Sequence, residues 1–160
     1  MIGHDCGHLS FSSSHLVNDI VGTLAFLPLF FPFEPWRIKH NHHHNNTNKL
    51  FEDNAWQPFQ SDYYESAPDL ERTIMRAVKG PFWYFASIGH WVKEHFFLST
   101  FTPDQQTRVK VSLTAVGIGA ILFFPYVLSN YGAWALIKYW FIPVFLGFHF
   151  WVKPSYVLID

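Results

Sequence analysis

The histidines of this 160-residue chain are spaced in a way that could support metal chemistry. Four of its ten histidines fall within positions 40–44. On a helix, His40, His43 and His44 stand at i, i+3 and i+4, which places three imidazoles on one face with Cβ atoms about 5–6 Å apart. His42 points away from that face. Because imidazole suits iron, zinc, copper and nickel, the stretch predicts part of a metal coordination shell.

A second pair, His4 and His8, stands four residues apart near the start of the chain, the spacing that lets two side chains share one metal. Gly3 and Gly7 each weaken a free helix by about 1 kcal/mol relative to alanine, so tertiary packing or metal must hold this segment. Structural zinc takes four ligands, commonly with thiolate, and Cys6 is the only cysteine. Five imidazoles therefore favour two metals close together, each with a position open for oxygen.

Other polar residues near these groups have weaker roles. Asp5 and Asp19 are candidates to orient imidazoles by accepting hydrogen bonds. His90 and His95 lie about 140° apart around a helix, so they are expected to be ordinary interfacial histidines. The sequence alone assigns no functional role to five histidines: His15, His42, His90, His95 and His149.

The composition points to lipid contact. Hydrophobic residues make up 49% of the chain and aromatic residues 20%, which is rich for a soluble domain of this length. Phe, Trp and Tyr serve membrane proteins as lipid-facing bulk and interfacial anchors. The net charge is −1 and no basic stripe is present, so a nucleic-acid partner is not expected. One cysteine excludes an intrachain disulfide.

The hydropathy pattern divides one domain, 1–160, into elements that would position the histidines. Residues 111–129 carry no charge, and 133–152 are broken only by Lys138, so we predict two transmembrane helices joined at 130–132. Pro28 and Pro32 interrupt the apolar segment 16–33, which favours an interfacial or re-entrant helix. That return would keep both histidine groups on one membrane side.

The remaining segments are more polar or strongly aromatic. We predict a first histidine segment at 1–15, a second at 36–44, a water-exposed polar loop with short helical turns at 45–81 and an aromatic interfacial helix at 82–98. The predicted fold class is all-α: an integral membrane protein with two C-terminal transmembrane helices, interfacial or re-entrant helices and a histidine-rich face.

The sequence around the histidines resembles that of the membrane fatty acid desaturases. HDCGH at 4–8 and HNHHH at 40–44, which fits H-x-x-H-H, are similar to the first two histidine boxes of that family. The stretches IGHDCGH, DIVGTLAFLPL, EPWRIKHNHHH, AWQP and HWVKEHF look like those of plastid-type ω-6 (Δ12) desaturases. The resemblance covers about residues 2–151.

The resemblance implies a four-helix membrane desaturase fold with two non-haem iron ions, which use O₂ and two electrons to place a cis double bond in a membrane lipid acyl chain. A monounsaturated acyl group desaturated at the ω-6/Δ12 position is the implied substrate. Ferredoxin in a plastid membrane, or a b-type cytochrome in the endoplasmic reticulum, would donate the electrons. The implied iron ligands are His4, His8, His40, His43 and His44.

The chain also departs from the family pattern. Family members place two further spans before the first histidine box and a third box after the last span, and neither is found in these 160 residues. We therefore expect a partial desaturase domain, from a truncated product or an incomplete gene model, that is inactive by itself. A hydroxylase on the same scaffold and a non-catalytic membrane protein with a metal-binding histidine cluster remain open alternatives.

Overall fold

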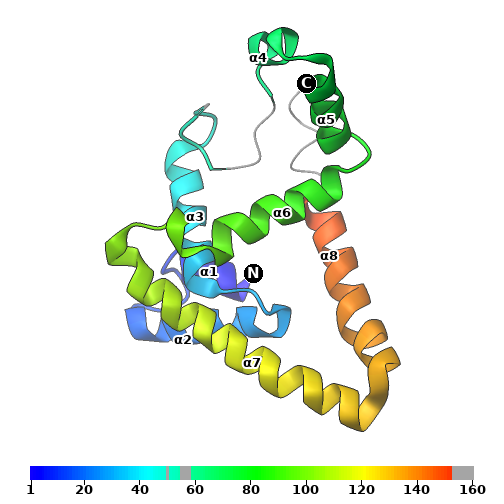
Figure 1. Cartoon of the computed structure of the whole chain (residues 1–160). Coiled ribbons are helices and arrows are strands. Elements are labelled where there is room, and N and C mark those ends of the chain that lie inside the picture. Colours follow the sequence, from blue (N-terminus) through cyan, green and yellow to red (C-terminus); the bar gives the residue numbers. More distant parts are fainter. Residues whose placement is uncertain (50, 55–58, 153–160) are drawn as a thin grey trace.

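The computed structural model describes residues 1–49, 51–54 and 59–152, and this part of the chain forms helices and no strand. The all-α prediction is confirmed. In chain order the elements are α1 (Ile2–Gly7), α2 (His15–Phe26), η1 (Leu27–Leu29), α3 (Phe33–Asn46), α4 (Ser61–Ser66), α5 (Asp69–Lys79), α6 (Trp83–Phe96), η2 (Leu98–Thr100), α7 (Pro103–Leu136), η3 (Ile137–Phe141) and α8 (Ile142–Val152) (Figure 1).

A serine-rich turn separates α1 from α2. Ser14 is the N-cap of α2, because its hydroxyl accepts the backbone N–H of Val17. The fully buried side chain of Asn18 braces the turn by donating to the carbonyl oxygens of Ser12 and Ser14, at 2.7 and 2.8 Å. These bonds return the chain so that α2 packs against the short α1, which supplies the tertiary support that its glycines require.

Prolines turn the chain sharply between α2 and α3. Pro28 lies in η1, Phe30 adopts a left-handed conformation with φ of 48°, and Pro32 is the N-cap of α3. As a result the run His15–Leu29, which comprises α2 and η1, forms with α3 a broken helix pair bent by 104°. A broken span and a re-entrant segment both have this shape. Arg37 of α3 closes the bend by pairing with Asp19 of α2.

The segment predicted as a polar loop, 45–81, contains two helices. The longer one, α5, begins with Asp69 and Glu71 in its first turn, where carboxylates interact favourably with the helix dipole. It ends at Gly80, whose N–H bonds to the carbonyl oxygen of Arg76. Both α4 and α5 extend away from the histidine-bearing helices in Figure 1. The AWQP stretch, 55–58, lies outside the described residues.

Helix α6 crosses beside α3 and is tied to it by one ion pair and one aromatic stack. Lys39 of α3 donates to the carboxylate of Glu94 at 2.8 Å and to the carbonyl oxygen of Thr100 at 2.9 Å. Phe31, just before α3, stacks on Trp91 with ring centroids 4.2 Å apart. These contacts hold the C-terminal half of α6 against residues 31–39, which include the first half of α3.

The C-terminal arm consists of α7, η3 and α8. Thr102 and Gln105 form a capping box at the start of α7, and Gly132 breaks the helix with φ of 76° and ψ of 171°. Figure 1 shows the chain doubling back at this end of α7. The π-helical turn of η3 carries Trp140, whose indole N–H donates to the carbonyl oxygen of Pro28 at 2.8 Å. The arm therefore touches the tip of the α2–α3 bend.

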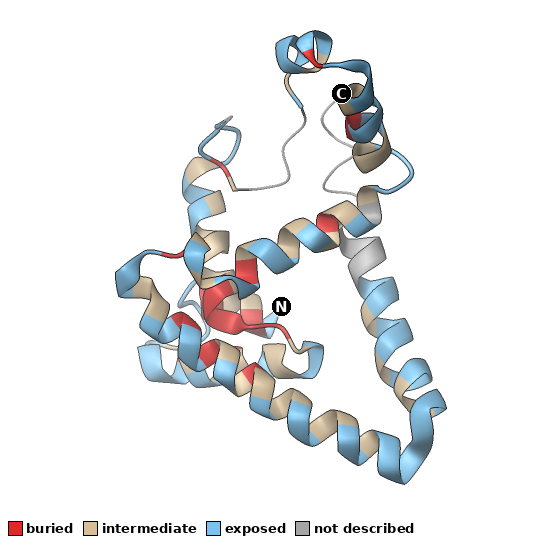
Figure 2. Cartoon of the chain, in the orientation of Figure 1, coloured by how far each residue is buried: buried red, intermediate tan, exposed pale blue. Residues whose placement is uncertain are grey.

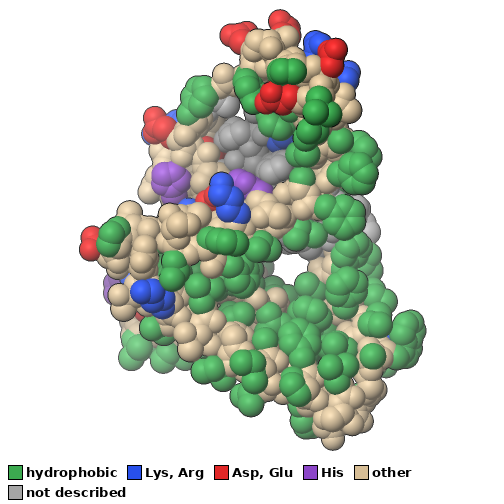
Figure 3. All heavy atoms as spheres, viewed as in Figure 1, with side chains coloured by type: hydrophobic (Ala, Val, Ile, Leu, Met, Phe, Trp, Pro, Cys, Tyr) green, Lys and Arg blue, Asp and Glu red, His purple; other side chains and the backbone are tan. Residues whose placement is uncertain are grey.

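Burial is concentrated at one end of the molecule. Buried residues gather around the start of α3, α1 and the first half of α7 (Figure 2), whereas hydrophobic side chains cover the outside of the arm (Figure 3). Within the described residues one helical run, Pro103–Gly147, is long and apolar enough to cross a membrane, and the bent α2–α3 pair would be a second. Only 11% of the most apolar window of that run is buried.

Candidate metal centre

Four of the five predicted ligands converge at one point. The nearest ring nitrogens of His4, His8, His40 and His44 all lie within 4.8 Å of one another. The Nε2 atoms of His8 and His40 are 3.1 Å apart, and those of His40 and His44 are 3.0 Å apart. Two of these imidazoles come from α1 and its C-cap residue, and the other two come from α3. The site therefore depends on the turns before and after α2, which bring α1 and α3 together.

Mutual hydrogen bonding cannot satisfy this cluster. The Nε2 atom of His40 faces two other Nε2 atoms, yet a neutral imidazole nitrogen offers either one proton or one lone pair. Bound metal would resolve this conflict, because each coordinating nitrogen then points its lone pair at a metal ion instead of at another imidazole. With metal–imidazole bonds of about 2.1 Å, two ligands about 90° apart have nitrogens about 3.0 Å from each other. The donor set therefore fits a metal ion.

Trp36 holds the two halves of the cluster together. Its indole stacks on the His40 imidazole, with centroids 4.4 Å apart and planes 17° from parallel. The Trp36 ring also packs against Gly7 of α1, where an added Cβ would lie 2.6 Å from the ring. Only a residue without a side chain allows α1 this close. Trp36 stands four residues, or about one helical turn, before His40. This spacing could have predicted the stacking contact, but the sequence analysis gave Trp36 no role.

The electrostatics of the cluster favour neutral imidazoles, which is the form that binds metal. Burial, followed by the neighbouring His44, His8 and His4, lowers the pKa of His40 to about 4. Burial and then His4 lower the pKa of His8. Burial lowers these pKa values because it removes water from the charged form, and the neighbouring imidazoles lower them because a second positive charge is unfavourable beside the first.

His43, the fifth predicted ligand, lies beside His44 on α3 and has a second partner of its own. Its Nδ1–H donates to the carboxylate of Asp53 at 2.7 Å, and it is not among the four converging residues, although its ring centroid is 5.8 Å from that of His44. The chain folds back after α3, and this return delivers Asp53. Helical periodicity gives no sign of such a contact, so the sequence reading missed Asp53.

The other candidate residues have separate contacts. Asp5 lies 3.6 Å from Nδ1 of His4, whereas Asp19 pairs with Arg37 and makes no bond to an imidazole among the described residues. His95 is buried, and its Nδ1–H donates to the carbonyl oxygen of Trp91 at 2.7 Å. His15 begins α2 on the surface. The side chain of His149 lies outside the described residues.

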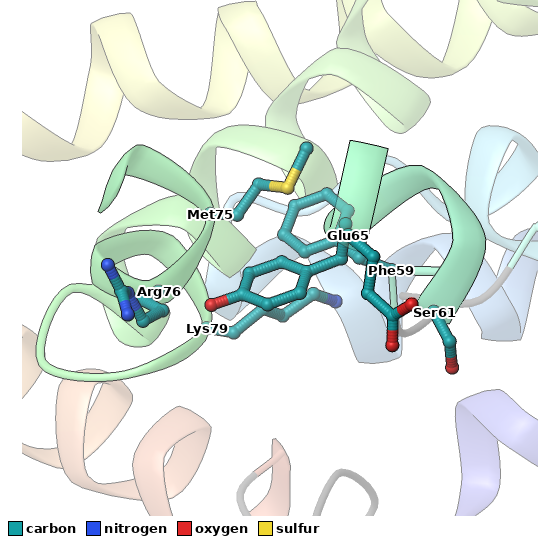
Figure 4. Close-up of a pocket in the computed structure, with 7 residues that line it drawn as sticks. Phe59, Ser61, Glu65, Met75, Arg76 and Lys79 are labelled. Atoms are coloured by element: carbon teal, nitrogen blue, oxygen red, sulfur yellow. The ribbon is translucent and has the colours of Figure 1, made fainter. Parts of the chain in front are cut away.

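A cavity of about 360 Å³ lies away from the histidines, between α4 and α5 (Figure 4). Seven residues line it: Phe59, Ser61, Tyr64, Glu65, Met75, Arg76 and Lys79. Burial lowers the pKa of Lys79 to about 8, and its ammonium group lies 5.3 Å from the Phe59 ring centroid. This hollow has no imidazole, so the candidate metal centre is the α1–α3 cluster.

The helical chain combines a long exposed apolar run with a cluster of four imidazoles, the features expected of histidine-ligated metalloproteins of membranes. Within that class the assignment is specific. The family model described as fatty acid desaturase matches residues 1–157. The chain belongs to the fatty acid desaturase family, as the histidine boxes predicted.

Curated relatives refine this assignment. The chain is 43% identical over 153 residues to an sn-1 oleoyl-lipid 12-desaturase of Synechocystis sp., covering 96% of this chain and 43% of that protein. It is 49% identical to a chloroplastic omega-6 fatty acid desaturase of Glycine max and 46% identical to one of Arabidopsis thaliana, in each case over 96% of this chain. It spans 36% and 34% of the length of those two plant proteins.

Proposed function

We propose that this chain is the part of an acyl-lipid desaturase that carries the first two histidine boxes, in an enzyme that introduces a cis double bond at the ω-6/Δ12 position of a monounsaturated acyl group. The observation that carries the proposal is the convergence of HDCGH and HNHHH on one point, through His4, His8, His40 and His44. Relatives named as oleoyl-lipid 12-desaturases and omega-6 desaturases support the position of the double bond.

The proposed cofactor is a pair of iron ions, held by His4, His8, His40, His43 and His44 together with ligands from the rest of the enzyme. Iron bound there would activate O₂ to remove two hydrogens from an unactivated acyl chain. The chain itself supplies neutral imidazoles, and the ring of Trp36 against His40 keeps them in place. The ring of Phe26 packs against the Trp36 indole, with centroids 4.8 Å apart.

We propose that residues 111–129 and 133–152 cross the membrane as two antiparallel spans of a four-helix desaturase fold, with the break at Gly132 between them. The bend between α2 and α3 would then be re-entrant, which places both histidine boxes at one face of the bilayer. The exposed apolar surface of the arm supports this arrangement. The acyl substrate would reach the iron site from the same lipid phase.

The proposed membrane is that of the plastid, with ferredoxin as the electron donor, because relatives from soybean and Arabidopsis are named as chloroplastic. An enzyme of the endoplasmic reticulum would take electrons from a b-type cytochrome instead. Adding each reduced donor to membranes that contain the enzyme, and measuring the turnover each supports, distinguishes the two.

The test uses the complete enzyme, expressed in a host rich in monounsaturated fatty acids and supplied with reductant. Gas chromatography of the fatty acids should show a new diunsaturated species, and the His44→Ala variant should not produce it. A hydroxylated acid in its place would assign the hydroxylase. If the protein is present in the membrane and neither product forms, the catalytic proposal is wrong.

A further inference from the structure

Three consecutive residues after α3 each contact a different histidine. The carbonyl oxygen of Glu52 lies 2.7 Å from Nε2 of His42, and the carbonyl oxygen of Asn54 lies 3.4 Å from Nε2 of His90. Between them, the carboxylate of Asp53 lies 2.7 Å from Nδ1 of His43. The return segment 52–54 therefore touches His42 and His43 of α3 and His90 of α6.

These contacts divide the histidines into two kinds. A carbonyl oxygen only accepts, so His42 and His90 must carry a proton on Nε2 to make these bonds. His43 differs because its bond uses Nδ1. A neutral imidazole with its proton on Nδ1 keeps the Nε2 lone pair, which is the atom through which imidazole commonly ligates a metal. His43 is thus prepared to bind metal through Nε2, whereas His42 is not.

The backbone conformation around the return segment positions the Asp53 carboxylate. Asn48 and Phe51 adopt left-handed conformations, with φ of 66° and 78°. The N–H groups of Glu52 and Asp53 both donate to the carbonyl oxygen of Lys49, at 3.2 and 3.1 Å. The Asp53 side chain is only 4% exposed, while that of Glu52 is 64% exposed and faces Lys49. One of two adjacent carboxylates is therefore buried against an imidazole, and the other is in solvent.

We propose that Asp53 is the positioning residue that makes His43 a ligand of the metal centre, by accepting its Nδ1–H and directing the Nε2 lone pair toward the metal. This inference rests on the proposed function, because it needs the metal that the histidine boxes would hold. It also accounts for two neighbouring histidines of one helix having different roles. A carboxylate partner raises the basicity of a ligating imidazole, and removing such a partner costs about 10–100-fold in metal affinity.

Asp53→Asn is the informative variant, because it keeps the shape of the side chain and removes its charge. Glu52→Gln is the matched control, since it removes the same charge one residue away. Among the described residues, the Glu52 side chain pairs with Lys49 and contacts no histidine. The complete membrane protein, stripped with a chelator, is titrated with Fe²⁺ without oxygen. We expect Asp53→Asn to raise the Kd for Fe²⁺ about 10–100-fold and Glu52→Gln to leave it within twofold.

A double-mutant cycle shows whether Asp53 acts through His43. If it does, Asp53→Asn has little further effect on the Kd for Fe²⁺ once His43→Ala is present. Independent, additive effects would overturn the inference, as would wild-type affinity in Asp53→Asn. If that variant fails to fold, ¹⁵N spectra of histidine-labelled wild-type protein decide the question: a proton on Nδ1 of His43 is expected, and one on Nε2 overturns the inference.

The outcomes separate this inference from the proposed function. A wild-type protein that binds Fe²⁺ and desaturates, with an Asp53→Asn variant of unchanged affinity, overturns the role of Asp53 alone. A complete wild-type protein that binds no Fe²⁺ overturns the proposed function, and the role of Asp53 with it.

Discussion

The histidine-bearing end of the molecule and the α7–α8 arm are stabilised in opposite ways. At the histidine end, side chains of α1, α2 and α3 interlock so closely that a Cβ added to Gly7 or Gly22 would lie less than 3.0 Å from an aromatic ring. Along the arm, only 11% of the most apolar window is buried, and an added Cβ at Gly117 would meet nothing within 4 Å.

The difference supports the proposal that the two regions have different surroundings. Apolar side chains left exposed over a whole helix are unfavourable in water, but lipid accepts them without any protein partner. The histidine end must instead hold several imidazoles against one another, which requires specific contacts. The closest packing thus lies where chemistry is proposed, and the proposed membrane placement would bury the arm in lipid. Four experiments can break or sharpen this contrast.

The largest expected effect is the loss of metal from His40→Ala. His40 lies between His8 and His44 and stacks on Trp36, so its removal takes the central donor from the cluster. We expect no measurable Fe²⁺ at this site by elemental analysis of the complete protein, and no desaturated product. His42→Ala, two residues away and bonded to a backbone carbonyl, should keep both. Equal iron content in the two variants would contradict the assigned cluster.

The second experiment places the same charge on two side chains of equal exposure. Ile121 of α7 is 73% exposed and Leu70 of α5 is 74% exposed. If lipid surrounds the arm, Ile121→Arg costs about 3 kcal/mol of membrane insertion, whereas Leu70→Arg on a water-facing helix costs nearly nothing. Extraction of membranes at alkaline pH should release the first variant and retain the second. Equal extraction of the two variants, whether both are released or both are retained, would contradict an arm that lies in lipid.

The third experiment tests the close packing at Trp36. Gly7→Ala would bring a methyl group to 2.6 Å from that indole, and such overpacking typically costs about 1–3 kcal/mol. We expect a lower midpoint of thermal unfolding in detergent and weaker Fe²⁺ binding, because α1 carries two of the four imidazoles. Gly89→Ala, where nothing lies within 4 Å, should preserve both quantities. A Gly7→Ala protein as stable as this control would show that the contact is not tight.

The smallest expected effect concerns His95, outside the cluster. Burial, offset in part by its hydrogen bond to Trp91, lowers the pKa of His95 to about 4. Lys39, Glu94 and His90 modify it further. In the unfolded chain this imidazole gains a proton below about pH 6.5, so protonation favours unfolding as the pH falls from 6.5 toward 4.

Relative to neutral pH, the loss of stability from His95 should be about 1 kcal/mol at pH 5.5. We expect the unfolding midpoint of wild-type protein to fall more between pH 7 and 5.5 than that of His95→Gln, since glutamine does not titrate. Parallel pH profiles for the two proteins would contradict a neutral, buried His95.

Several features of the fold follow from local sequence patterns. The apolar run at 111–129 and the connection at 130–132 anticipated a long helix and its break at Gly132. The two helices within 45–81 were harder to predict, because their charged residues also suit a loop. The π-helical turn that presents Trp140 to Pro28 has no sequence signal, since it depends on a partner far away in the chain.

By itself the sequence determined the candidate ligands and the family, because i, i+4 spacing and the two histidine boxes are local patterns. Only the tertiary structure decided which histidines meet: His4, His8, His40 and His44 converge, and His43 turns to Asp53. The physical reason is that ligand spacing lies within one helix, whereas an imidazole is oriented by hydrogen bonds from chain segments that periodicity does not connect. Helix geometry brings histidines to a face, and the fold assigns each ring nitrogen its partner.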